Sequence, residues 1–155
     1  MQGETRVIAE LNARLAEELT AINQYFVHAE MCEDWHYDRL AETIKQRSIV
    51  EMKHAESLIE RILYLDGRPI VSVLNKMHIG ADVAKMHAND LASEIDAVKA
   101  YNESIRICVE LKDNGTKELL ESILAAEEEH VDWLEAQQTQ IEQAGLENYL
   151  AEQIG

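Results

Sequence analysis

Two copies of a Glu-x-x-His pattern run through this sequence, and each follows a lone glutamate at the same distance of 33 residues (51 − 18 and 127 − 94). On a helix, side chains three positions apart share a face, so each copy can direct a carboxylate and an imidazole at one metal ion. The candidate ligands are Glu18, Glu51, His54, Glu94, Glu127 and His130. Four carboxylates and two imidazoles from four helices are the ligand set of a carboxylate-bridged pair of metal ions. The pattern therefore requires a fold that brings four helices together around one point.

Apolar residues recur at steps of three and four in four long stretches, which predicts helices over about 5–34, 39–65, 83–111 and 117–144. A short amphipathic helix over 146–154 follows Gly145. Segment 66–81 has no helical period, and its 16 residues, at roughly 3.3 Å each, can travel the length of a helix of about 40 Å. The second and third helices are then parallel, which predicts an all-α, ferritin-like four-helix bundle with one long crossover and a short fifth helix.

Capping residues mark several helix ends. Asp66-Gly67, with Pro69 just beyond, predicts the end of the second helix, and Asp82 is the expected N-cap of the third. Asn114-Gly115 predicts a tight turn, with Thr116 as the cap of the fourth helix.

Composition excludes several classes of protein. A length of 155 residues with one proline and six glycines fits a single helical domain, 1–155. The net charge of −16 argues against nucleic acid, and the lack of a run of about 18 apolar residues argues against a membrane span. The first residues lack the layout of a signal peptide, so a cytoplasmic location is expected. Cys32 and Cys108 are expected to be buried thiols rather than a disulfide.

Geometry assigns a role to each candidate ligand. His54 and His130 would each bind one metal, Glu51 and Glu127 would bridge the two metals, and the two upstream glutamates would be terminal ligands. Mostly oxygen ligands with two imidazoles suit iron or manganese, with zinc as a competitor. Six ligands around two metals leave open positions, which indicates chemistry with dioxygen or peroxide.

Other glutamates, tyrosines and histidines of the chain are expected to have roles outside direct metal binding. Glu128 and Glu129 point elsewhere and are expected in solvent. Tyr25 and Tyr101 each follow an upstream glutamate by seven residues. Each is either a core tyrosine that hydrogen-bonds a buried glutamate or a donor that orients a ligand or supplies an electron. The histidines outside the motif are expected in structural, surface or loop positions; they are His28, His36, His78 and His87.

The chain resembles bacterioferritin over nearly its whole length. The resemblance is carried by AINQYFVHAEM (21–31), EMKHAESLIERILYLDGRP (51–69), IGADV (79–83) and EEEHVDWLEAQQTQIEQAGLENYLAEQIG (127–155). It implies iron storage and detoxification in a 24-chain shell built from twofold dimers. It also implies a ferroxidase centre with two iron ions per chain at the six ligands above, with Tyr25 beside it, and dioxygen or peroxide as the oxidant. A ferredoxin-like protein would be the electron donor.

The resemblance further gives Met52 the role of a haem ligand, with one b-type haem shared by two chains. The surrounding pocket would be Leu19, Asn23, Phe26 and Ile49. The chain departs from the family at 45–50, where Lys-Gln-Arg-Ser-Ile-Val replaces a pattern like Tyr-His-Glu-Ser-Ile-Asp. Gln46 and Val50 lack metal-binding groups, so an additional iron site on the inner surface is not expected.

Two other functions use the same residues. A soluble di-iron or di-manganese peroxidase or oxidase of the rubrerythrin type shares the ligand set, although no Cys-x-x-Cys pair is present to deliver electrons. An assembly subunit that binds haem without an active centre is the other, and the intact ligand set argues against it.

Overall fold

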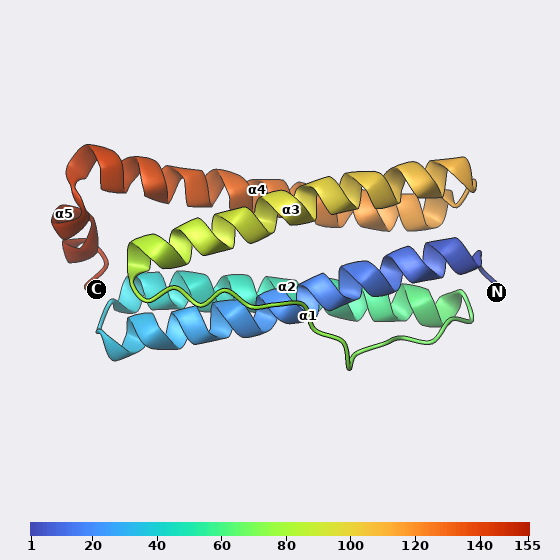
Figure 1. Cartoon of the computed structure of the whole chain (residues 1–155), viewed down its shortest axis with the longest axis horizontal. Helices are drawn as coiled ribbons and strands as arrows, with labels where there is room; N and C mark the ends of the chain where they lie inside the picture. The colour runs from blue at the N-terminus through green and yellow to red at the C-terminus, as the bar shows by residue number, and fades with distance from the viewer.

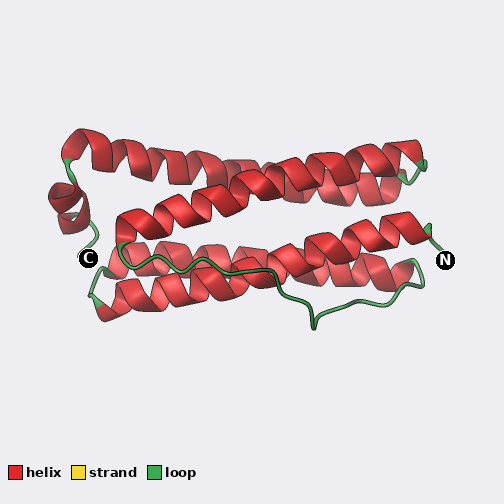
Figure 2. Cartoon of the chain, in the orientation of Figure 1, coloured by secondary structure: helices red, strands yellow, loops and turns green.

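The computed structural model describes residues 1–155, and it contains helices but no strands (Figure 2). Four of the five helices are long. Their bounds are α1 Thr5–Asp34, α2 Asp38–Tyr64, α3 Val83–Glu110 and α4 Asn114–Ala144, and the short α5 spans Leu146–Ala151. The prediction of an all-α fold with a short fifth helix is confirmed, although α5 ends three residues before the predicted boundary.

The long helices form two antiparallel pairs (Figure 1). α1 packs along α2, and α3 packs along α4. The segment between α2 and α3 runs back along the bundle, so α2 and α3 point in the same direction. The predicted crossover is therefore confirmed. No helix combines the length and apolar character that a membrane span requires.

A polar stripe on α1 holds the first and last parts of this crossover. Backbone N–H groups of Ile70, Asn75, His78 and Gly80 donate to the side chains of Asn12, Thr20, Gln24 and His28, in that order, at 2.8 to 3.0 Å. These side chains recur at multiples of four residues and so lie on one face of the helix. The expectation of a surface or loop position for His28 is wrong, because the residue is fully buried and accepts the Gly80 N–H.

The first three long helices end in the same way. His36, Asp66 and Lys112 have left-handed backbone angles (φ of 63°, 57° and 59°), although none of them is glycine. In each case the next N–H donates to the carbonyl five residues earlier, as for Tyr37 and Cys32 at 2.9 Å. This Schellman arrangement satisfies carbonyls that the helix end leaves free. At the end of α2 it is Asp66, not Gly67, that takes the left-handed conformation.

The start of α4 differs from its prediction. The helix begins at Asn114, so Asn114-Gly115 lies inside its first turn rather than in a preceding turn. Asp113 is the cap, because its carboxylate accepts the Thr116 N–H at 3.0 Å and the Thr116 hydroxyl at 2.7 Å. Asp82 caps α3 as predicted, since its carboxylate accepts the Lys85 N–H at 2.8 Å.

The core consists of two apolar clusters with a polar layer between them. One cluster contains Val7, Leu11, Leu15, Ala55, Leu58, Ile62, Leu65, Tyr101, Cys108, Leu120 and Ile123. The other contains Tyr25, Ala29, Cys32, Leu40, Ala41, Ile44, Val83, Met86 and Tyr149. Each cluster holds one free, buried cysteine, as predicted. The candidate ligands lie between the clusters.

Candidate metal centre

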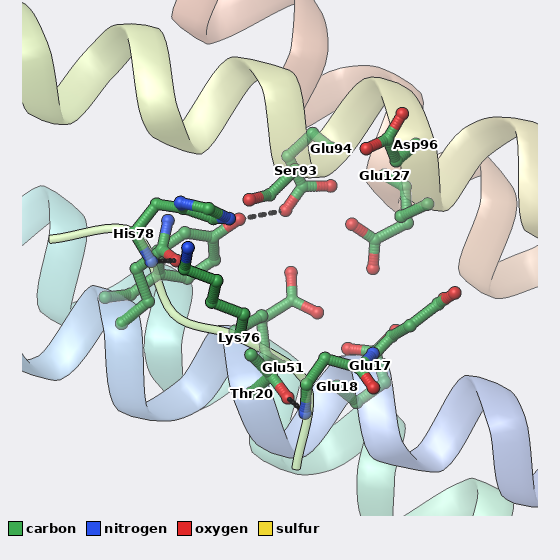
Figure 3. A pocket seen from close by; sticks show the side chains of 15 residues that line it. Glu17, Glu18, Thr20, Glu51, Lys76, His78, Ser93, Glu94, Asp96 and Glu127 are labelled. Atoms are coloured by element: carbon green, nitrogen blue, oxygen red, sulfur yellow. Dashed lines mark hydrogen bonds between the residues drawn. The ribbon is translucent and has the colours of Figure 1, made fainter.

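The structure brings the candidate ligands together from all four long helices. Glu18 comes from α1, Glu94 from α3, and the two Glu-x-x-His motifs from α2 and α4. Every one of the four carboxylates is at most 2% exposed. In Figure 3, glutamates from both helix pairs approach one shared space. Buried carboxylates this close are costly unless cations or hydrogen bonds compensate their charge.

One group of ligand atoms surrounds His54. Its Nδ1 lies 3.3 Å from Glu51 Oε2, 3.2 Å from Glu127 Oε1 and 3.6 Å from Glu18 Oε2. These four residues each offer an atom within 4.8 Å of the others, which is close enough to hold one cation.

A second group forms around His130. Its Nδ1 lies 3.0 Å from Glu94 Oε1, and together with Glu51 these residues meet the same 4.8 Å criterion. Glu51 belongs to both groups, which fits a bridging carboxylate. Glu127 belongs only to the first group, so its bridging role stays a prediction.

The cluster divides its carboxylates into protonated and ionised members. Burial, reinforced by neighbouring carboxylates, raises the pKa of Glu18 and of Glu127 well above the usual range. Burial also opposes ionisation of Glu51, but hydrogen bonds from Glu18 and His54 and the charge of Arg47 outweigh it and lower the pKa. The metal-free centre therefore retains protons that an incoming cation would displace.

The neighbouring carboxylates favour the protonated form of His54. Burial by itself would lower its pKa, but hydrogen bonds to Glu127 and Glu51 outweigh burial and raise the pKa to about 9. A metal ion needs the neutral ring, so binding at this group releases the proton of His54.

Tyr25 and Tyr101 each form a hydrogen bond to a glutamate of the other helix pair. Tyr25 of α1 donates its hydroxyl to Glu94 of α3, and Tyr101 of α3 donates to Glu18 Oε1 of α1 at 2.6 Å. Each tyrosine is buried and, as expected, hydrogen-bonds a buried glutamate. The glutamate is the upstream ligand of the other half, which spacing along one helix could not predict.

Sequence reasoning missed one residue at the centre, Arg47. Its Nη2 lies 2.8 Å from Glu51 Oε1 and 3.2 Å from Glu127 Oε2. Its side chain is only 14% exposed. The signal that could have found it is its spacing, four residues before Glu51 on the same helix face.

A cavity of about 270 Å³ reaches the centre from the side of α1, α3 and the crossover. Glu17, Lys76, His78 and Asp96 are among its lining residues (Figure 3). Burial raises the pKa of Glu17 to about 7, although Arg14 opposes the shift.

The remaining histidines and glutamates follow the sequence interpretation, apart from His28. Glu128 and Glu129 are exposed. His36 lies in the turn between α1 and α2, and His78 lies in the crossover. His87 is structural as expected: it is fully buried, and its Nε2 lies 3.0 Å from the Tyr149 hydroxyl of α5.

Comparisons with known proteins agree with the fold. Residues 8–144 match the family described as Ferritin-like domain. The chain is 42% identical to a bacterioferritin of Brucella melitensis biotype 1, over 96% of this chain and 92% of that protein. It is 41% identical to the bacterioferritin of Mycobacterium leprae, over 98% and 96% of the two chains. A bacterioferritin of Rhodobacter capsulatus is 41% identical over 96% and 92%.

Proposed function

Because this chain belongs to the bacterioferritin family of ferritin-like proteins, we propose that it stores iron by oxidising Fe(II) at the centre between its four helices. The observation that carries the proposal is the buried polar layer. Glu18 Oε2 and Glu94 Oε2 are buried there without a hydrogen-bond partner, and His130 Nδ1 has only Glu94 Oε1 nearby, at 3.0 Å. Buried polar atoms normally have partners, so unpaired ligand atoms facing one space are what a cation site requires.

The donor set suits iron as substrate. Four carboxylates and two imidazoles offer mostly hard oxygen atoms, the set that binds iron or manganese. Two Fe(II) ions together release two electrons, which reduce one dioxygen to peroxide or one peroxide to water. The protons displaced from Glu18, Glu127 and His54 offset the incoming positive charge. Tyr25 holds Glu94 in place and is positioned to supply a further electron.

The assembled form is the second part of the proposal. Relatives that match nearly the whole chain support a 24-chain shell built from twofold dimers, with Fe(III) deposited as a mineral inside. A shell would keep the mineral in solution. The anchoring of α5 through Tyr149 to His87 and Gln137 fits a fifth helix with a fixed position in such an assembly.

Met52 fits the proposed haem site. Its side chain is 47% exposed on α2, so the thioether is free for a ligand outside the bundle. Leu19, Phe26 and Ile49 are half-buried, and Asn23 is exposed. Met52 residues from two chains related by a twofold axis would together hold one b-type haem. Such a haem would transfer electrons from a ferredoxin-like donor to stored iron.

Iron titration tests the proposal. Fe(II) is added in air to the purified protein at rising ratios, Fe(III) absorbance is followed, and iron is then measured in the protein peak from a sizing column. We expect iron to co-elute with a large assembly far beyond two ions per chain. Uptake that stops at two per chain on a small oligomer would replace storage with a peroxidase or oxidase of the rubrerythrin type.

Variants connect storage to the centre. Glu18→Ala and His130→Ala should lose rapid oxidation, by more than about 100-fold, while assembly remains. Glu128→Ala, at an exposed glutamate two residues before His130, is the matched control and should oxidise iron at the wild-type rate. Rapid oxidation in either ligand variant would contradict the assignment.

A further inference from the structure

A guanidinium group occupies one side of the centre. Arg47 Nη2 lies 2.8 Å from Glu51 Oε1 and donates a hydrogen bond to Glu127 Oε2 at 3.2 Å. The two carboxylates come from α2 and α4, so Arg47 links the two helix pairs through the centre itself. Its Nε is buried and has no hydrogen-bond partner.

The two glutamates divide their oxygens between two partners. Glu51 Oε2 and Glu127 Oε1 face His54 Nδ1, at 3.3 and 3.2 Å. Glu51 Oε1 and Glu127 Oε2 face Arg47. A bridging carboxylate gives one oxygen to each metal, so the oxygens on the Arg47 side are those that a second metal, beyond the His54 group, needs.

The contact of an arginine with the two motif glutamates has no counterpart in the α3–α4 half of the molecule. The motifs are 76 positions apart (127 − 51), and the residue 76 positions after Arg47 is Ile123, which is buried in an apolar cluster. No equivalent cation faces the centre from α4. The His54 group can accept a metal without moving Arg47, whereas a bridge toward His130 and Glu94 cannot form while Arg47 holds Glu51 Oε1.

Resting on the proposed di-metal site, we propose that Arg47 is a built-in counter-cation that makes metal loading sequential. The first metal binds at the His54 group. The second binds through Glu51, Glu94 and His130, and it must displace the guanidinium, which weakens its affinity. Arg47 is thus a positioning residue that links the carboxylates of Glu51 and Glu127 and compensates their charge.

The displaced side chain has a place to go. A cavity of about 280 Å³ between α2 and α4 is lined by Arg47 together with Gln46, His130, Trp133 and Glu129. The carboxylate of Glu129 offers a counter-charge there. This cavity is separate from the one that reaches the centre between α1, α3 and the crossover.

Anaerobic Co(II) titration tests the proposal with a readout that does not depend on iron oxidation. Calorimetry and Co(II) absorbance give the affinity of each step for the assembled wild-type protein, Arg47→Met, Arg47→Lys and the control Arg106→Met. Arg106 is exposed and pairs with Glu103 and Glu110, so its variant removes the same charge away from the centre. The steps are assigned by the loss of the second step in Glu94→Gln.

We expect two steps in the wild type, the second weaker by about 10-fold or more, as for other groups that tune metal ligands. Arg47→Met should strengthen the second step by about 10-fold and the first by less than about 3-fold. Arg47→Lys, which keeps the charge on a shorter side chain, should give a second-step affinity between those of the wild type and Arg47→Met. It also serves if Arg47→Met does not fold. Equal shifts in both steps, or none, would overturn the proposal. A wild type that does not bind two Co(II) would instead contradict the proposed function.

Discussion

The two helix pairs carry the same ligand pattern 76 residues apart, and they also end their first helices alike. The backbone bond from Tyr37 to Cys32 has its counterpart in the bond from Asp113 to Cys108, at 2.9 and 2.8 Å. Around the histidines the pairs differ. His54 meets three carboxylates, whereas His130 meets one carboxylate and stacks on Trp133 at 6.0 Å between ring centroids.

The difference shows that equal spacing does not produce equal electrostatics. The α1–α2 half contributes the charged surroundings, with the Arg47 guanidinium and a protonated His54. In the α3–α4 half, His130 lies among aromatic rings: it stacks on Trp133 of α4, and Tyr25 of α1 lies edge-on to it at 5.3 Å. The two metal positions should therefore respond differently to changes in matched residues.

The largest expected difference separates Glu51 from Glu94. Glu51 belongs to both ligand groups and Glu94 to one. Glu51→Gln should weaken both Co(II) steps by more than about 100-fold, and Glu94→Gln should weaken only the second to that extent. The measurement is anaerobic Co(II) titration, with Glu128→Gln as the exposed control. Similar losses in the two ligand variants would mean that Glu51 is not shared.

The next largest effect is the loss of stability in acid caused by His87. This residue of α3 corresponds to Leu11 of α1, which lies 76 positions earlier (87 − 76). Burial lowers the pKa of His87 to about 4, below its usual value in an unfolded chain of about 6.5. The unfolded state then binds more protons between these values. Stability from neutral His87 is fully present above about pH 6.5 and is lost as pH falls toward 4, by roughly 3 kcal/mol in all.

Thermal melts of the metal-free protein from pH 7.5 to 4.5 test this expectation. The melting temperature of the wild type should fall more steeply than that of His87→Leu, because the carboxylates titrate in both and only the wild type must charge a buried histidine. Parallel profiles would remove His87 as the cause.

The smallest effect tests the crossed tyrosines. Tyr101 donates to Glu18 and Tyr25 to Glu94. Tyr101→Phe should therefore weaken the first Co(II) step and Tyr25→Phe the second, each by roughly 10-fold, since both remove a hydrogen bond that orients a ligand. If each tyrosine instead affected the metal of its own helix pair, the crossed arrangement would be wrong.

Much of this molecule follows from short-range patterns. Apolar periodicity predicted the four long helices to within a few residues, and the length of segment 66–81 predicted the crossover. The matched spacing predicted that the candidate ligands lie in one layer. A helix that buries its apolar stripe also turns the candidate ligands on that stripe toward the inside of the bundle. The miss at Thr116 was also local: Asp113 accepts its N–H, and a carboxylate three positions earlier is the better cap.

The sequence by itself determined the helices, the candidate ligands and the family, because these depend on residue type and on spacing within one helix or loop. Only the tertiary structure decided which side chains meet between helices. It joined Arg47 to Glu127, Tyr25 to Glu94 and the buried His28 to the crossover. Those contacts depend on the rotation and separation of packed helices, which spacing along one helix does not encode.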